Sequence, residues 1–363
     1  GEGGAKTKFR MNMDAIYTLK TLENQNRNAT PEEQEVLSKY VGWGGLPEAF
    51  IKKTLEEITP DFISQYPETK HFSEVLADFL GTDPEHICLV NGSAEGIRYI
   101  IQAFTAPHGR IVGVVPSYFM FQVYSQMYGR DFVGVPYNED LTMDVDNILN
   151  VLTENTQMLI LLNPNNPMGN VYTDKEFEHI LKVCKEKQIT LLIDEAYHYF
   201  YPKTFIKYAL NERRVLVTRT FSKMFSMAGC RLGYVVGHPE DVKLVQKFCT
   251  PHNTNAFAML FAEKIIETPG MVDSLIAIFR EGREYLIEAL DKNRYRHKGE
   301  AGNFIFIEPK TGAGEVVTRM KEEKKILIKT YANVGEFGDC LRVSIGAKEY
   351  MEQFMSALLE LDC

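Results

Sequence analysis

Seven short apolar runs between residues 87 and 236 most constrain what this chain can fold into. Each run is followed by a stretch with helical periodicity or a polar loop before the next begins. The runs are Ile87–Val90, Ile111–Val115, Phe132–Val135, Met158–Leu162, Thr190–Ile193, Val215–Thr218 and Gly233–Val236. Strands that are apolar on both faces and alternate with amphipathic helices are typical of a mostly parallel sheet covered by helices on both sides. The sequence therefore predicts an α/β fold whose large domain is built on a mostly parallel seven-stranded sheet.

The pattern changes after about residue 255. A long amphipathic helix is predicted over residues 271–291, and strands over residues 303–307 and 340–345 with a helix between them. A last helix is predicted over residues 350–361. We expect an atypical N-terminal segment (1–50), a large domain (51–255) and a small α+β domain (256–363).

Composition excludes several classes of protein. The chain has 363 residues and a net charge of −9, so a broad basic surface for nucleic acid is not expected. Its six cysteines form no C-x-x-C pair and lie near no histidine at metal-ligand spacing. No apolar run reaches the length of a membrane span. The sequence thus predicts a reduced, cytoplasmic protein without a metal site and without nucleic acid or membrane partners.

Polar motifs follow several of the runs, where loops leave the sheet. Ligands of α/β proteins lie at the carboxyl ends of the strands, so these motifs are candidates for one site. Five occur in order: Asn91-Gly92-Ser93-Ala94-Glu95-Gly96, Pro116-Ser117-Tyr118, Asn163-Pro164-Asn165-Asn166-Pro167, Asp194-Glu195-Ala196-Tyr197 and Thr220-Phe221-Ser222-Lys223, with Arg231 eight residues after the lysine.

Together the motifs supply what a pyridoxal phosphate (PLP) enzyme needs. Lys223 offers an amine for the cofactor aldehyde, and Asp194 an acid for the pyridine nitrogen. Tyr197 and Asn166 can donate to the phenolate oxygen, and Tyr118 can stack on the ring. Alone, Lys223 would be read as an exposed loop lysine and Asp194 as a strand-end turn residue.

The phosphate needs a separate set of donors. The turn at Ser93 follows a strand and opens a helix, and such helix N-termini bind anions. Thr220 and Ser222 add hydroxyl donors, and Arg231 adds a planar cationic fork. These spacings favour a phosphate site over an ordinary strand-to-helix turn.

Over about residues 51–363 these motifs resemble fold-type I PLP enzymes, specifically class I/II aminotransferases of the histidinol-phosphate aminotransferase group. The resemblance implies that Lys223 is the Schiff-base lysine and general acid/base, with Asp194 and Tyr197 as the other catalytic residues. It implies a homodimer with shared sites, in which Tyr66 reaches the phosphate of the neighbouring subunit. Arg342 matches the arginine that binds the substrate α-carboxylate, with Asn166 and Lys329 beside it. The cofactor-binding residues would be Ser93, Ala94, Glu95, Tyr118, Asn166, Asp194, Tyr197, Thr220, Ser222, Lys223, Arg231 and Tyr66.

Three positions depart from that family. Met168 stands where threonine is usual, and Lys329 where an arginine helps to hold a substrate phosphate. The segment that covers the substrate is missing at the N-terminus. In its place, residues 11–50 resemble the start of plasmid- or phage-borne DNA methylase–helicase proteins, through Asn28-Ala29-Thr30-Pro31-Glu32-Glu33-Gln34 and Tyr40-Val41-Gly42-Trp43-Gly44-Gly45-Leu46. Trp43 is a candidate for lining the substrate pocket.

The predicted function is transfer of an amino group between an amino acid or amino alcohol phosphate and a 2-oxo acid. The donor would be histidinol-phosphate-like or aromatic. Two alternatives stay open: a PLP-dependent decarboxylase of a threonine-phosphate-like amino acid, and a chimeric, low-activity PLP-binding protein.

Overall fold

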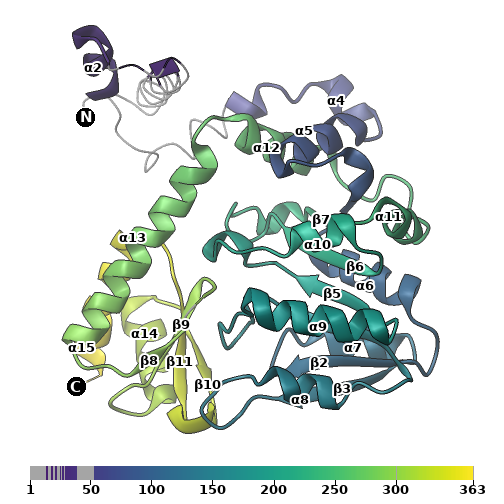
Figure 1. Ribbon diagram of the computed structural model, residues 1–363. Coiled ribbons are helices and arrows are strands. Elements are labelled where there is room, and N and C mark those ends of the chain that lie inside the picture. The colour runs from purple at the N-terminus through teal and green to yellow at the C-terminus, as the bar shows by residue number, and fades with distance from the viewer. Residues whose placement is uncertain are drawn as a thin grey trace. The chain divides into compact units, whose positions relative to one another are not determined.

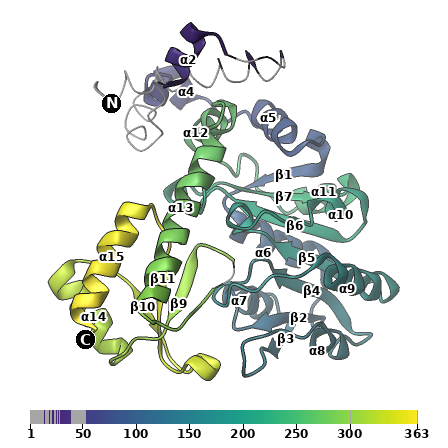
Figure 2. The ribbon, with the colours of Figure 1, turned by 60° about the vertical axis from the view of Figure 1, so that its left-hand side comes forward.

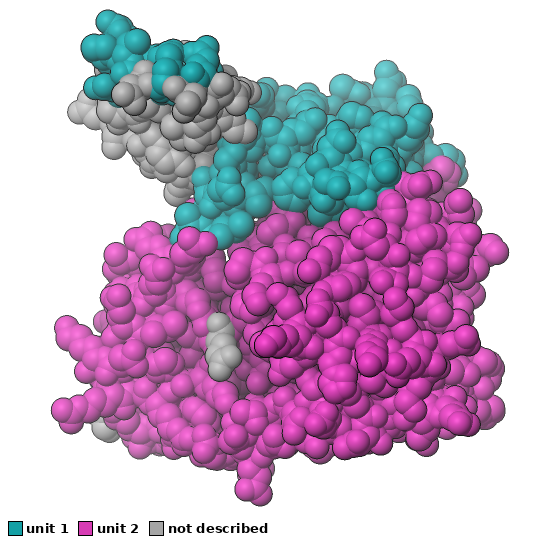
Figure 3. All heavy atoms as spheres, in the orientation of Figure 1, with its two compact units in different colours: residues 1–84, 254–277 teal, residues 85–253, 278–363 magenta. Residues whose placement is uncertain are grey.

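A computed structural model describes residues 53–299 and 301–362, together with residues 29–38 and scattered positions between 14 and 27. The predicted end of the atypical N-terminal segment at residue 50, and Trp43, lie outside the described residues. The chain divides into two compact units, one of residues 1–84 and 254–277 and the other of residues 85–253 and 278–363 (Figure 3). The domain boundaries expected near residues 50 and 255 stay predictions.

The described part of the first unit is helical. A capping box opens α2, because the Glu33 N–H donates to Thr30 Oγ1 (3.3 Å) and the Thr30 N–H to the Glu33 carboxylate (2.9 Å). Helix α5 ends at Gly81, whose φ of 68° suits glycine. Helices α5 and α12 pack against each other. The elements are α2 (Pro31–Ser38), α4 (Pro60–Ser64), α5 (Lys70–Leu80), α12 (Ala256–Glu267) and the first residues of α13 (Met271–Lys292).

The second unit contains the predicted seven-stranded sheet (Figure 1). Its strands run in the order β1-β7-β6-β5-β4-β2-β3. The pairs from β6 to β3 are parallel, whereas β7 is antiparallel to both β6 and β1. The strands are β1 (Ile87–Val90), β2 (Arg110–Val115), β3 (Asp131–Pro136), β4 (Thr156–Leu162), β5 (Thr190–Asp194), β6 (Val215–Thr220) and β7 (Gly233–Gly237). The predicted runs and the observed strands agree.

Helices cover both faces of this sheet. Helices α6 and α7 lie on one face, and α8, α9 and α10 on the other (Figure 2). A buried apolar cluster joins α6 to the sheet, and Gly96 allows the close approach, since a Cβ there would lie 2.8 Å from Val235 Cγ2. The helices are α6 (Ser93–Phe104), α7 (Met120–Met127), α8 (Val145–Asn150), α9 (Asp174–Glu186), α10 (Ile206–Asn211) and α11 (Pro239–Gln246), with 3-10 turns at Pro84–His86, His198–Phe200 and Ala228–Cys230.

A four-stranded antiparallel sheet follows in the same unit, in the order β10-β11-β9-β8. Strands β9 (Phe304–Ile307) and β11 (Cys340–Ser344) were predicted, whereas β8 (His297–Lys298) and β10 (Lys329–Tyr331) were not. Helices α14 (Ala313–Lys324) and α15 (Lys348–Leu361) complete this region, with a 3-10 turn at Gly335–Phe337. The chain thus has the predicted α/β architecture with a small α+β part at its C-terminal end.

Two general findings bear on function. Among the described residues, no helix is long and apolar enough to cross a membrane. The same residues include no group of three or more His, Cys, Asp or Glu placed to hold a metal ion.

Candidate active site

A cavity of about 190 Å³ opens at the carboxyl ends of β4, β5 and β6 in the second unit. Leu162, Asp194 and Thr220 are the last residues of these three strands. Ten of the predicted site residues line the cavity: Ser93, Ala94, Tyr118, Asn166, Asp194, Tyr197, Thr220, Ser222, Lys223 and Arg231. Leu162, Ala196 and Ala228 complete its wall.

One end of the cavity is built for an anion. Ser93 and Ala94 open α6, so their N–H groups have no acceptor in a preceding helical turn. Gly92, the N-cap residue with φ 81°, lies against the Arg231 guanidinium, since a Cβ at Gly92 would be 2.8 Å from Nη2. Arg231 itself has φ 54° and donates to the carbonyl oxygen of Ala228 (3.2 Å). The left-handed turn thus places a cation beside a helix N-terminus.

Two hydroxyls lie at the same end. Thr220 Oγ1 accepts from the Ser222 N–H (3.1 Å) and donates to Ser222 Oγ (2.9 Å). This turn fixes both side chains at the start of the loop that carries Lys223. With the backbone N–H groups and Arg231, the hydroxyls complete a donor-rich cup.

Asp194 also lines the cavity and is 2% exposed. Its Oδ1 accepts from the Thr218 hydroxyl (3.0 Å) and from the Ala196 N–H (3.2 Å). No hydrogen bond is found for Oδ2 among the described residues. Burial raises the pKa of Asp194 to about 7, although both hydrogen bonds oppose that rise. A buried carboxyl with one free oxygen suits a cationic N–H partner.

Lys223 opens onto the cavity from the loop after β6, with Nζ 5.6 Å from the centre of the Tyr197 ring. Desolvation by the cavity walls lowers the pKa of the Lys223 amine, and the positive charges of Arg342 and Arg231 lower it further. A lowered pKa increases the share of the neutral amine, which is the nucleophilic form.

Asn166 joins the two parts of the second unit at the cavity. Its Nδ2 donates to the Tyr197 hydroxyl (2.8 Å), and its Oδ1 accepts from Arg342 Nη2 (3.2 Å). Burial raises the pKa of Tyr197 to about 12, so its hydroxyl stays protonated. The Arg342 guanidinium lies 4.3 Å from the centre of the Phe304 ring, and its buried Nε has no hydrogen-bond partner among the described residues.

Four predicted residues do not line the cavity. The Glu95 carboxylate accepts from the Asn91 N–H (2.8 Å), and its own N–H donates to the Gly92 carbonyl oxygen (3.0 Å). Arg342 reaches the cavity through Asn166, and Lys329 on β10 is its exposed neighbour in strand register. Tyr66 belongs to the first unit, where it is 80% exposed beside a separate cavity of about 260 Å³.

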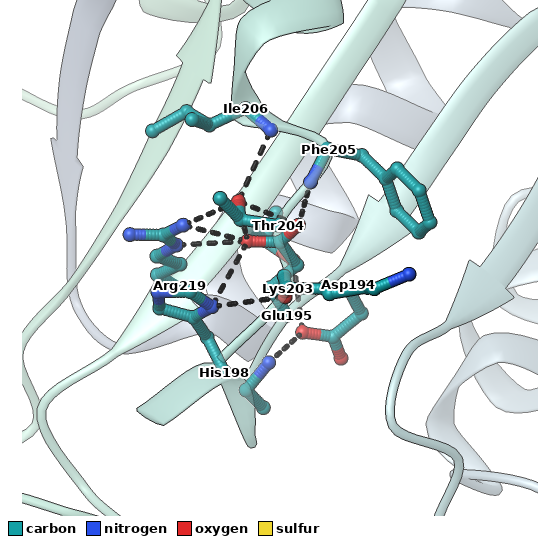
Figure 4. A network of polar contacts seen from close by, with 10 residues as sticks. Asp194, Glu195, His198, Lys203, Thr204, Phe205, Ile206 and Arg219 are labelled. Carbon is teal, nitrogen blue, oxygen red and sulfur yellow. Dashed lines mark hydrogen bonds and ion pairs between the residues drawn. The ribbon is translucent and has the colours of Figure 1, made fainter. Parts of the chain in front are cut away.

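Sequence reasoning gave no role to a buried ion pair formed by residues next to Asp194 and Thr220 (Figure 4). Glu195 and Arg219 are 1% and 4% exposed, and Arg219 donates to Glu195 Oε2 through Nε (3.0 Å) and Nη2 (2.8 Å). Thr204 Oγ1 and the Phe205 N–H also donate to the Glu195 carboxylate. Glu195 follows Asp194 and Arg219 precedes Thr220, so the pair ties together the two strand ends that carry site residues. In the sequence, Glu195 stands inside the motif that begins at Asp194, and Arg219 stands directly before the motif that begins at Thr220.

Two other positions are structural. Nδ1 of His198 lies 3.3 Å from the Lys203 carbonyl oxygen, and burial lowers the pKa of its ring to about 4. Met168, which replaces the usual threonine, is 5% exposed in a cluster with Phe306 and Phe337.

Comparison with known sequences and structures identifies the family of this chain. The sequence model of the family "Aminotransferase class I and II" matches residues 38–358. The chain is 31% identical to the histidinol-phosphate aminotransferase of Thermoanaerobacter pseudethanolicus over 87% of this chain and 90% of the relative. It is 28% identical to that of Aquifex aeolicus over 94% and 96%.

Solved structures agree on the fold. The histidinol-phosphate aminotransferase of Sinorhizobium meliloti, in complex with pyridoxal 5′-phosphate, has a TM-score of 0.77 at 22% identity and covers 88% of each chain. The enzyme of Clostridium acetobutylicum has a TM-score of 0.77 at 23% identity, covering 88% of this chain and 96% of that one. The chain therefore belongs to the class I and II aminotransferases, and it is a PLP-dependent transaminase.

Proposed function

We propose that this transaminase moves an amino group between an amino acid or amino alcohol phosphate and a 2-oxo acid, with a histidinol-phosphate-like or aromatic donor. The single observation that carries the proposal is Arg342. Its buried Nε lacks a partner among the described residues, while its Nη2 is already fixed by Asn166 at the cavity. A partly buried guanidinium with an unused Nε donor is suited to the carboxylate of an amino acid or a 2-oxo acid.

The cavity residues fit the cofactor. Gly92, whose positive φ suits glycine, brings the backbone close to the Arg231 guanidinium, so backbone and guanidinium together can form the anion cup. Asp194 keeps one oxygen free in a buried setting. When bound, PLP supplies an electron sink for the electron pair left on the substrate α-carbon.

Each group around the cavity then has a binding role. The phosphate is held by Ser93 and Ala94 at the start of α6 and by Thr220, Ser222 and Arg231. Asp194 pairs with the pyridine nitrogen, and Asn166 and Tyr197 donate to the phenolate oxygen. Tyr118 packs on the ring face. Glu95 shapes the phosphate turn through its contact with Asn91.

Lys223 performs the proton transfer. Its amine would hold the cofactor and would move the proton between the substrate α-carbon and cofactor C4′. The lowered pKa supports this role, because a general base works best when its pKa is near the ambient pH.

The substrate side is formed by the small sheet. Arg342 binds the α-carboxylate of the amino acid or 2-oxo acid, and Lys329, its register neighbour on β10, binds the phosphate of an amino alcohol phosphate. Lysine acts as a point charge and not as a fork, so the donor phosphate is held less rigidly than by arginine.

Assembly and location are part of the proposal. Two copies form a homodimer in which Tyr66 of the partner subunit contacts the phosphate, and the enzyme works in the cytoplasm. The resemblance of residues 11–50 to methylase–helicase proteins marks a short segment joined to the aminotransferase body. The family match begins at residue 38 and therefore includes the last part of this segment.

The test is a single-turnover spectrum of the PLP-loaded protein with histidinol phosphate, aromatic amino acids and threonine phosphate as donors. Conversion of the cofactor to its amine form with histidinol phosphate or an aromatic donor is the expected result. Release of carbon dioxide with the aldehyde form retained would instead show the decarboxylase. No response to any donor would favour the low-activity chimera.

A further inference from the structure

Two free cysteines face each other behind the turn that leads into α6. Cys88 lies on the edge strand β1 and is 4% exposed, and Cys249 lies just after α11 and is partly exposed. Their sulfur atoms are 3.6 Å apart, although 161 residues separate them in sequence. A disulfide has an S–S length of about 2.05 Å, so bond formation needs an approach on the order of 1.5 Å.

The two thiols differ in a way that suits stepwise oxidation. Cys249 is reachable from solvent, and the hydrogen bond from Cys88 lowers the pKa of its thiol. The same hydrogen bond, together with burial, raises the pKa of Cys88. Thiolates react with peroxides and thiols do not, so Cys249 is the group attacked first and Cys88 is the resolving group.

We propose that Cys88 and Cys249 form a reversible modification site that a peroxide converts to a disulfide. The Cys249 thiolate attacks a peroxide oxygen, the O–O bond breaks, and hydroxide leaves a sulfenic acid on Cys249. The Cys88 sulfur then attacks Cys249 Sγ, the S–O bond breaks, and water leaves as the S–S bond forms. The sulfur pair loses two electrons and the peroxide gains them, and a thiol reductant reverses the change.

Hydrogen bonds join the chain segments that carry this pair to the anion cup. Asn253 Nδ2 donates to the Leu89 carbonyl oxygen (3.2 Å) and to Glu95 Oε2 (3.4 Å). Glu95 Oε2 also accepts from the Asn91 N–H (2.8 Å), and Asn91 precedes the N-cap of α6. Drawing Cys249 toward Cys88 therefore displaces Asn253 and loosens the turn. This expectation rests on the proposed phosphate site: oxidation of the pair weakens cofactor binding several-fold.

The test begins with the full chain loaded with PLP. It is treated with one equivalent of hydrogen peroxide, its remaining thiols are alkylated, and its mass and peptides are measured. We expect a loss of two hydrogens and one linked peptide pair, Cys88 with Cys249, restored by dithiothreitol. Cys249→Ser and Cys88→Ala should abolish the link. Cys184→Ala, which removes another buried cysteine, should leave it intact.

The second measurement is the dissociation constant of PLP in the reduced and oxidised forms, by titration of the visible absorption band. A several-fold weaker constant in oxidised wild type, absent in Cys249→Ser, is expected. If both cysteines are alkylated after peroxide treatment, or if only other cysteines are linked, the proposal of a modification site is wrong. An oxidised protein with unchanged affinity would overturn the coupling. Failure of the reduced protein to bind PLP would count against the proposed cofactor site and leave the mass result standing.

Discussion

Asp194 at the end of β5 and Tyr197 in the turn after it are three residues apart, yet their expected contributions to turnover differ. Asp194→Ala removes the partner of the pyridine nitrogen and is expected to lower kcat by about 100-fold or more. Tyr197→Phe removes one neutral donor whose role Asn166 shares, so kcat should fall by only about fivefold. Steady-state kinetics compare kcat of the two variants, with the donor that the single-turnover spectrum identifies. Equal losses would contradict the assignment of Asp194.

The pKa of Asp194 makes a second prediction at this scale. In the cofactor-free protein the folded state raises this pKa from 3.8 to about 7, so folding favours the protonated acid. The stability that the acid form contributes is complete below pH 3.8 and is lost as pH rises through about 7. Relative to Asp194→Asn, which stays neutral, wild type should therefore become less stable between about pH 5 and pH 8. Urea unfolding at both pH values measures the difference, and parallel pH dependences of the two proteins would refute it.

At the scale of elements, β5 and β6 hold the site because their ends are bound together by the Glu195–Arg219 pair. Removing one partner of a buried pair leaves an uncompensated charge, so Glu195→Gln should lower the free energy of unfolding by about 3 kcal/mol. Glu212→Gln is the matched control, because Glu212 pairs with Lys185 at 2.8 Å on the surface. Its cost should stay below about 1 kcal/mol. Urea unfolding of the two variants measures both losses. Similar losses would show that the buried pair contributes little to stability.

The sequence predicted those strands and helices whose apolar residues form a pattern over at least four residues. The seven strands of the large sheet were found because each run of four or five residues contains at least three apolar residues. Strands β8 and β10 were missed because two or three residues show no periodicity, and their pairing depends on β9 and β11 being in place. The loop motifs predicted most of the cavity wall, because each follows a strand end.

Contacts between residues that are far apart in the sequence could not be predicted without the fold. No spacing in the chain shows that Arg342 meets Asn166, or that Arg219 lies beside Glu195, since both contacts depend on strand pairing. The same holds for Cys88 and Cys249, which look scattered in the sequence and are in contact in the structure. Tyr66 and Lys329 keep their predicted roles as predictions.

At the scale of the whole molecule, shared active sites lead to a complementation test. In a homodimer of the proposed kind, each site takes Lys223 from one subunit and Tyr66 from the other. Lys223→Ala should be inactive, and Tyr66→Ala should bind PLP weakly. Mixing the two variants under conditions that exchange subunits should restore activity, because one site of the mixed dimer has both residues. Activity no greater than that of Tyr66→Ala alone would contradict shared sites.

The pairing of β1 has a consequence for how the protein is made. Strand β1 emerges first from the ribosome, but it bonds only to β7, the last strand of the large sheet. The helix that opens the anion cup follows β1 directly, and Arg231 lies just before β7. A growing chain therefore cannot complete the cup until β7 has been synthesised. The cofactor therefore binds late in the synthesis of the protein. Until then, the partly synthesised domain must avoid aggregation without a bound cofactor.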